Sequence, residues 1–239
     1  MRGQRRGSAF SRLKDKARAL VERQKSPPAP IQNLRAVTDH IQKYFGLNFF
    51  TLHEEKSTVV HLDVHVVLPS APRPYYTLLT SGMSDRAMRG LRSAAKSALA
   101  EVCLCLPKEW PIGQKDMEWA TPEFFWPIVA LKNVARYPHV HETWLAAGHT
   151  IGSSQQPMAL DPANRFVGLI LVKPRSFSEE AQQITFADGR EIQYLAIIPL
   201  LKEELTFKLE FGADALNERL NAAGITELLN PHRRSVISE

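Results

Sequence analysis

Residues 59–68 read VVHLDVHVVL, and this run indicates what kind of fold the chain adopts. Apolar side chains alternate there with His61, Asp63 and His65, and a period of two is typical of a β-strand. Similar strand-forming runs occupy residues 47–53, 75–80, 99–106, 166–172, 184–187 and 191–198. We therefore expect a sheet in which the strand at 59–68 turns an apolar face to the core and its histidine-bearing face to solvent.

Helical segments are interspersed with these strands. Apolar residues repeat at helical spacing over residues 34–45, and Gly46 is expected to end that helix. Further helices are predicted over 121–137, 200–211 and 214–223, with Pro138, Gly212 and Gly224 beyond their ends. Asp188-Gly189 predicts a hairpin, and Pro199 is expected to end its second strand. The fold class that follows is α+β, with one domain whose mixed, largely antiparallel central sheet is flanked by helices.

Charge and proline content divide the chain. Residues 1–25 hold nine Lys or Arg and two acidic residues, which leaves 21 of the 30 basic and 23 of the 25 acidic residues for the remainder. The stretch KSPPAP at 25–30 then breaks any helix. We predict a basic N-terminal segment and linker at 1–29, a folded domain at 30–231 and a C-terminal tail at 232–239. A body so close to neutrality argues against a groove built for nucleic acid.

The basic segment has its own possible role. Apolar residues at helical spacing over 8–24 would give a basic amphipathic helix that touches an anionic surface through residues 1–25. The alternatives are a solvated helix packed loosely on the body and a translation start upstream of the true one.

Two cysteines, Cys103 and Cys105, lie in one apolar run. A lone Cys-x-Cys supplies too few ligands for zinc, so we interpret both as apolar side chains in a reducing compartment. No run approaches the roughly 18 apolar residues of a membrane span, and the N-terminus lacks the apolar core of a signal peptide. We therefore expect a cytoplasmic protein.

Four stretches, in this order and spacing, resemble the Suppressor of fused domain family. They are residues 73–86 (RPYYTLLTSGMSDR), 100–111 (AEVCLCLPKEWP), 135–138 (ARYP) with 144–151 (WLAAGHTI), and 197–205 (IIPLLKEEL). The resemblance covers most of residues 33–222. It implies one mixed α/β domain that binds a protein partner, with no catalysis, no cofactor and no small-molecule substrate.

Members of this family differ in length and in partner. Animal members carry a second domain and hold a Gli transcription factor in the cleft between the two domains. This chain is similar to the shorter, single-domain bacterial members, several of which resemble immunity proteins against toxin domains. In animal members an acidic residue and a tyrosine help to bind the Gli peptide. Their counterparts here are His149 and Tyr137, which does not favour a Gli-like peptide in that form.

The predicted partner site therefore consists of loop residues at one end of the sheet, because binding groups concentrate in loops. Its members are Tyr137, His149, Ser81, Ser84, Asp85 and Arg86. Core packing accounts for most of the aromatic side chains between 110 and 144. Trp110 or Trp119, in the loop, would mark the partner site if exposed.

A second class of function stays open beside this one, namely a metal-dependent or serine hydrolase. Histidines that could serve as zinc ligands or general bases would be brought together by the fold. They are His61, His65, His139, His141 and His149. A solvated strand face with loop histidines is the alternative interpretation, and Ser81, Ser84 and Asp85 are residues that turns use to bond their own backbone. The chain also lacks the Gly-x-Ser-x-Gly elbow near these serines.

Overall fold

A computed structural model describes residues 33–57, 59–90, 98–113, 121–152 and 165–237. The basic segment and linker predicted at 1–29 lie outside the described residues, as does Trp119.

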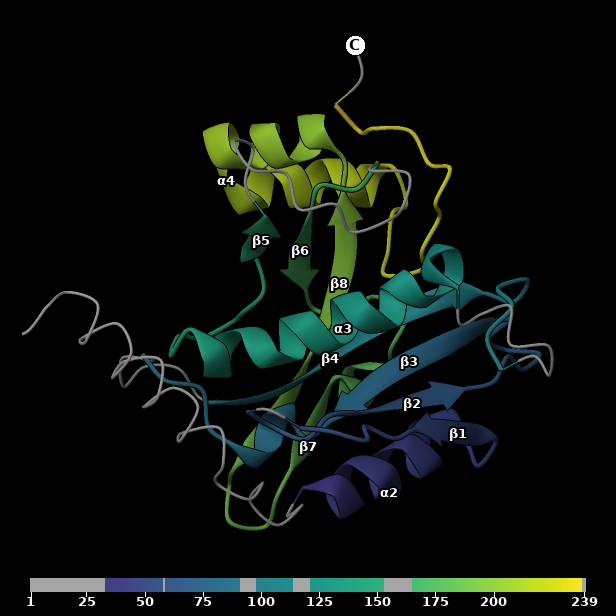
Figure 1. Cartoon of the computed structure of the whole chain (residues 1–239). Coiled ribbons are helices and arrows are strands. Elements are labelled where there is room, and N and C mark those ends of the chain that lie inside the picture. Colours follow the sequence, from purple (N-terminus) through teal and green to yellow (C-terminus); the bar gives the residue numbers. More distant parts are fainter. Residues whose placement is uncertain (1–32, 58, 91–97, 114–120, 153–164, 238–239) are drawn as a thin grey trace, which may run out of the picture.

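One eight-stranded sheet forms the centre of the structure (Figure 1). Its strands are β1 (Phe49–Leu52), β2 (Asp63–Val67), β3 (Tyr75–Ser81), β4 (Leu99–Pro107), β5 (Thr150–Gly152), β6 (Gly168–Val172), β7 (Gln183–Thr185) and β8 (Glu191–Leu200). The order is β1-β2-β3-β4-β8-β6-β5, and β7 pairs with β8 beside this path. Among these eight strands only β4 and β8 run parallel to each other, and every other pair is antiparallel. The predicted mixed, largely antiparallel sheet is confirmed.

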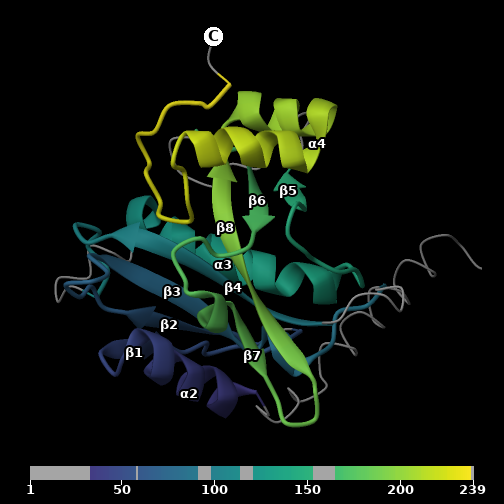
Figure 2. The ribbon, with the colours of Figure 1, turned by 180° about the vertical axis from the view of Figure 1, so that it is seen from behind.

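Three helices cover the two faces of the sheet. Helix α3 (Pro122–Val140) packs on one face, together with the inward side chains of β2, β3 and β4. Helices α2 (Leu34–Phe45) and α4 (Lys202–Ala222) pack on the other. Figure 1 shows α3 in front of the sheet, and the strands lie in front of it in the view from behind in Figure 2. The two faces thus have separate apolar cores. None of these described helices combines the length and apolar character that crossing a membrane requires.

Strand β2 departs from the prediction made for residues 59–68. It begins only at Asp63, and all five of its residues are buried. The expectation of a solvated histidine face is wrong, because α2 and the second core cover that side of the sheet. His65 is 2% exposed, and its ring nitrogens lie 2.9 Å from the Thr51 hydroxyl and 2.9 Å from the Ser81 hydroxyl.

Two prolines do not end their elements as predicted. Helix α3 continues through Pro138 to Val140, and β8 continues through Pro199 to Leu200. Pro199 is tolerated because the partner strand β4 pairs with β8 only as far as Ala196. The Pro199 carbonyl points to that vacated side, where it accepts a hydrogen bond from Arg233 at 2.7 Å. The missing N–H of proline therefore costs no strand pairing.

Helix α4 consists of two consecutive helices separated at Gly212, as the glycine pattern predicts. Gly212 has φ 89° and ψ 172°, a conformation that side chains rarely adopt, and it separates the two parts. Figure 1 shows the parts lying side by side above the end of β8.

Strand β8 changes partner halfway along its length. Ala196 pairs with Cys103 of β4 on one side and with Val172 of β6 on the other, and beyond it β8 follows β6 alone. The place beside the end of β4 is taken by the chain after α4. Cys105 donates its N–H to the Glu227 carbonyl at 2.9 Å and accepts from the Leu229 N–H at 2.8 Å. Residues 227–229 thus act as a short extra strand.

The predicted tail at 232–239 begins in contact with the body. The Arg233 side chain is 8% exposed and pairs with Glu204, whose side chain is fully buried near the start of α4. Glu204 also accepts the N–H groups of Leu201 at 3.0 Å and Val236 at 3.1 Å. This carboxylate therefore joins the first turn of α4 to residues 233–236.

Removing the cation of this pair is expected to destabilise the protein strongly. Arg233→Ala leaves the Glu204 charge buried without its partner, which typically costs about 3 kcal/mol or more. The measurement is the free energy of unfolding from urea titration. Arg190→Ala is the matched control, since the Arg190–Asp188 pair is about half exposed and its loss should cost below roughly 1 kcal/mol. Equal losses for the two variants would contradict the role given to Glu204.

The buried His65 should make stability depend on pH. Burial lowers the pKa of His65 from 6.5 to about 4, against a smaller opposing effect of Asp63. Between pH 6.5 and 4 the unfolded chain therefore binds a proton that the folded chain does not. As the pH is lowered from 6.5 to 4, the free energy of unfolding should decrease, by up to about 3 kcal/mol from this residue.

The matched variant is His65→Gln, which keeps polar atoms near Thr51 and Ser81 but does not titrate. Burial lowers the pKa of His40, His139 and His149 as well, so the variant should show a shallower fall rather than none. Urea titrations at several pH values compare the two proteins. An unchanged slope would show that His65 is not neutral in the fold.

Candidate partner-binding site

A buried carboxylate holds the turn that contains most of the predicted site. Glu101 on β4 is fully buried, and one of its oxygens accepts the Ser84 N–H at 2.9 Å and the Ser84 hydroxyl at 2.6 Å. The Gly82 N–H lies 3.1 Å from the same oxygen, and the Thr80 hydroxyl donates to the other at 2.6 Å. Burial raises the pKa of Glu101, and the hydrogen bonds from Ser84 and Thr80 oppose that rise. The turn, a short 3-10 helix η1 (Met83–Asp85), is thereby fixed to the sheet.

Glycine is required where this turn leaves β3. Gly82 has φ 104°, and a Cβ built on it would lie 1.8 Å from the His61 carbonyl oxygen. No side chain fits there without moving the chain at 61. The turn therefore packs directly on the backbone that enters β2.

The turn also packs on the C-terminal end of α3. His139 in the last turn of α3 is buried, and its Nε2 lies 2.9 Å from the Met83 carbonyl. Farther along, Arg89 pairs with Glu142 at 3.1 Å. These contacts join residues 83–89 to 139–142, which lie in or directly after the stretches 73–86 and 135–138 that carry the family resemblance.

The structure divides the predicted site residues into two groups. Ser81 and Ser84 are 2% and 1% exposed, and their hydroxyls are engaged by His65 and Glu101. They position the turn and cannot touch a partner directly. Asp85 is half-buried and accepts the Asn33 N–H at 3.2 Å, which fixes the start of α2 to the turn.

The remaining predicted residues reach the surface. Arg86 is exposed, and the partly exposed Tyr137 ring contacts the His141 ring at a tilt, with centroids 4.4 Å apart. His149 lies farther along the chain, against Trp144 at 4.4 Å and next to β6. Exposed Val140, at 53%, adds an apolar group beside the Tyr137–His141 pair.

The five histidines of the hydrolase alternative serve different contacts. His65 bonds Thr51 and Ser81, and His139 bonds the Met83 carbonyl. The His141 ring contacts Tyr137, and the His149 ring contacts Trp144, both at a tilt. Among the described ranges, no three His, Cys, Asp or Glu side chains come close enough to hold a metal ion.

His61 takes part in a hydrogen-bonded group that the sequence did not reveal. Its Nδ1 lies 2.7 Å from the Ser57 hydroxyl and its Nε2 lies 3.0 Å from the Asp63 carboxylate. The Ser57 hydroxyl also donates to Glu54 at 3.1 Å, and Glu54 pairs with Arg136 and Lys132 of α3. The group ties the loop before β2 to α3. Only residue spacing in three dimensions reveals it, because Ser57 and Glu54 carry no recognisable motif.

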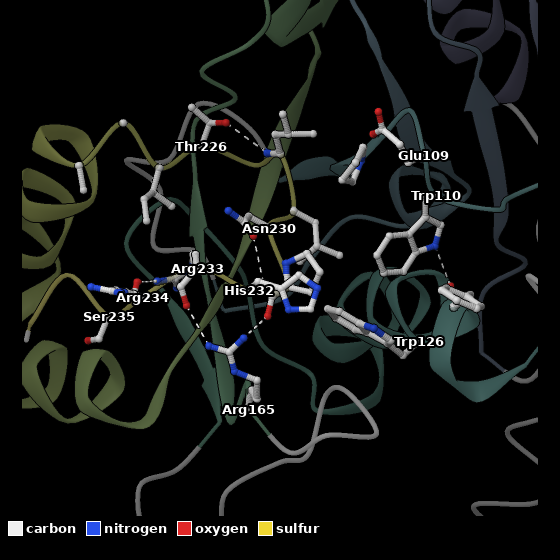
Figure 3. Close-up of a pocket in the computed structure, with 18 of the residues that line it drawn as sticks. Glu109, Trp110, Trp126, Arg165, Thr226, Asn230, His232, Arg233, Arg234 and Ser235 are labelled. Atoms are coloured by element: carbon white, nitrogen blue, oxygen red, sulfur yellow. Dashed lines mark hydrogen bonds between the residues drawn. The ribbon is translucent and has the colours of Figure 1, made fainter.

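A large pocket lies at the N-terminal end of α3, beside the part of β4 that no longer pairs with β8. Its volume is about 1310 Å³. One wall consists of residues 223–236, and the opposite wall of the loop after β4 and the first turns of α3. Figure 3 shows Trp110 and Trp126 across the pocket from Arg233 and Arg234.

Trp110 belongs to this pocket but is not an exposed anchor. It is 8% exposed, and its indole N–H donates to the Phe124 carbonyl at 3.0 Å. Aromatic density alone could not separate a pocket wall from a surface anchor. The other wall comes from the predicted tail and the residues before it, which have no distinctive composition.

Comparison with known proteins places this architecture. The model of the family described as Suppressor of fused protein (SUFU) matches residues 58–234, well over half of the 239 residues. No curated protein matches the sequence significantly.

Several solved structures share the fold. A Suppressor of fused homologue from Neisseria gonorrhoeae is 15% identical, with a TM-score of 0.63, over 88% of this chain and all of its own. The protein in a Sufu–Fu complex is 13% identical, with a TM-score of 0.60, over 87% of this chain and 93% of its own. Drosophila Suppressor of fused is 15% identical, with a TM-score of 0.60, over 88% of this chain. This chain spans about half (52%) of the Drosophila protein.

The family match includes the strands β2 to β8, the Glu101-anchored turn and the segment that pairs with Cys105. The chain therefore belongs to the Suppressor of fused protein family.

Proposed function

We propose that this protein is a non-catalytic binding module that holds a protein partner at the surface formed by the 83–89 turn and the end of α3. The observation that carries the proposal is the construction of this surface. Buried Glu101 and His139 fix the backbone of the turn. Arg86 on the turn and Val140 at the end of α3 are exposed, and Tyr137 of α3 is partly exposed. Tyrosine and arginine on a rigid support are typical of residues that dominate binding energy.

Other findings support a partner rather than a substrate. A related protein in the solved structures was determined as a Sufu–Fu complex. The polar side chains that could serve in catalysis, such as Ser81 and Ser84, are buried and satisfied within the fold. Because Ser81 and Ser84 are only 2% and 1% exposed, a substrate cannot reach their hydroxyls in this conformation.

Two biological uses agree with such binding. The protein would act as an immunity protein if its partner is a toxin domain, and as a regulator if it holds a signalling protein. We place it in the cytoplasm, because Cys103 and Cys105 are both buried free thiols whose pKa is raised by burial. Such thiols suit a reducing compartment.

Capture from cells tests the surface. The tagged full chain and the double variant Tyr137→Ala, His149→Ala are used as baits in cells of the source organism, with quantitative mass spectrometry as the readout. We expect a protein that is enriched by the wild type and reduced at least tenfold by the double variant, because interface tyrosines commonly contribute more than about 1.4 kcal/mol. Arg190→Ala, on the distant β7–β8 hairpin, is the control. Identical enrichment with all three baits would refute the site.

The non-catalytic half of the proposal has a separate test. The Ser57 hydroxyl lies 2.7 Å from His61, whose other ring nitrogen lies 3.0 Å from Asp63, so Ser57 is the serine with the most hydrolase-like surroundings among the described residues. Its hydroxyl donates to Glu54 at 3.1 Å instead of to the imidazole, and we expect a fluorophosphonate probe to leave it unmodified. Intact-mass spectrometry reads the result, with Ser57→Ala as the reference. Stoichiometric labelling that the variant abolishes would establish a reactive serine instead.

A further inference from the structure

The pocket beside the end of β4 is too large for an ordinary small-molecule site. Its volume of about 1310 Å³ exceeds the roughly 300–1,000 Å³ of clefts that hold drug-sized ligands. We propose that this groove binds an extended segment of a partner protein that carries an apolar residue between an acidic and a basic residue. The proposal rests on the protein-binding function above and gives it a second contact site with a defined peptide chemistry.

One wall of the groove is a rigid aromatic surface. The Trp110 ring meets Phe124 edge-on, with centroids 5.7 Å apart, and its N–H is fixed by the Phe124 carbonyl. Trp126 packs against Phe166 at 6.0 Å. Because these rings are already held in place, an apolar side chain that packs on them orders little of the protein.

The opposite wall presents backbone hydrogen-bonding groups to the groove. Residues 227–229 bond β4 only through the Glu227 carbonyl and the Leu229 N–H, so the peptide groups of Leu228 point away from the sheet. The Leu228 N–H bonds the Thr226 hydroxyl at 3.2 Å, and no described residue donates to the Leu228 carbonyl. The Leu228 side chain, 37% exposed, lies at the rim. An extended segment could therefore pair with this edge as an added strand.

Charged side chains on the two walls of the groove determine which residues the bound segment should carry. The guanidinium of Arg165 bonds the carbonyls of Pro231 and Arg233, and Arg233 is paired with buried Glu204. Arg234 is exposed, and its guanidinium forms no hydrogen bond or ion pair with a described residue. It is the cation available to a ligand on that wall.

Acidic side chains line the other wall. Glu109 and Glu123 are both exposed, and Glu109 has only the exposed Lys108 at 3.8 Å. Figure 3 shows Glu109 and Arg234 on opposite sides of the pocket, with the tryptophans nearer to Glu109. A segment with an acidic residue toward Arg234 and a basic residue toward Glu109 complements both, and complementarity of this kind selects partner and direction.

Selection from random linear peptides tests this inference. A displayed library is panned against the immobilised full chain, and enriched peptides are labelled for fluorescence anisotropy. We expect enrichment of an aromatic or aliphatic residue flanked by opposite charges. Peptides without tryptophan should also shift the intrinsic tryptophan emission of the protein, since Trp110 and Trp126 line the groove.

Charge reversal then locates the site. Arg234→Glu should weaken the selected peptide about tenfold, because it replaces an attractive contact by a repulsive one. Exchanging the acidic residue of the peptide for lysine should restore binding to this variant. Leu228→Glu, at the rim, should also weaken binding. Arg190→Glu and the double variant Tyr137→Ala, His149→Ala should bind the peptide as the wild type does.

Each other outcome would overturn the inference. Peptides that bind all variants equally, or that lose binding only in the Tyr137, His149 variant, do not use the groove. Failure to enrich any peptide would exclude a linear ligand, while the capture experiment would still decide the protein-binding function. Binding that appears only after removal of residues 1–32 would identify the chain's own N-terminus as the occupant. A dimer in light scattering that Leu228→Glu dissociates would identify a second copy.

Discussion

The change of partner of β8 at Ala196 shapes the rest of the molecule. Because β8 pairs with β4 only as far as Ala196 and then follows β6 alone, one side of β4 beyond Cys103 has no partner among the eight strands. Unpaired backbone inside a protein is costly, and here Cys105 finds its partners in Glu227 and Leu229. The segment after α4 is consequently drawn into the sheet, and the space left beside it becomes the groove.

Two buried carboxylates organise the loops around this frame. Glu101 gathers donors from Thr80, Gly82 and Ser84, which shapes the turn next to α3. Glu204 gathers Arg233 and two backbone N–H groups, which shapes the wall of the groove. Both are single side chains that collect several donors from segments remote in sequence. Backbone conformation at the two proposed surfaces is therefore set from inside the protein.

Local signals in the sequence were sufficient for much of the fold. Gly46 ends α2, Asp188-Gly189 makes the β7–β8 hairpin, and Gly212 interrupts α4. Each of these depends on neighbouring residues alone. The alternation around His65 could not tell a solvated face from one covered by α2, because burial depends on what packs there. Likewise Pro199 was expected to end β8, since the absence of β4 beside it is a property of the sheet.

The candidate sites divide in the same way. The sequence was sufficient to group the 81–86 turn with Tyr137, because the family resemblance includes both. It could not show that Ser81 and Ser84 face inward. Neither the pairing of Glu204 with Arg233 nor the strand at 227–229 has a short-range signature. The groove therefore lay beyond what composition and spacing could predict.

Residues 229–233 are attached to the body at both ends. A hydrogen bond to Cys105 fixes Leu229 and the ion pair with Glu204 fixes Arg233, so the segment between them loses little conformational entropy when a ligand binds. A ligand that lies along this span meets a surface already in its bound shape, and the association rate should approach that of rigid-body docking. Cleaving the backbone within this segment would let its two ends move independently, and association with a ligand would then become slower because it requires the segment to order.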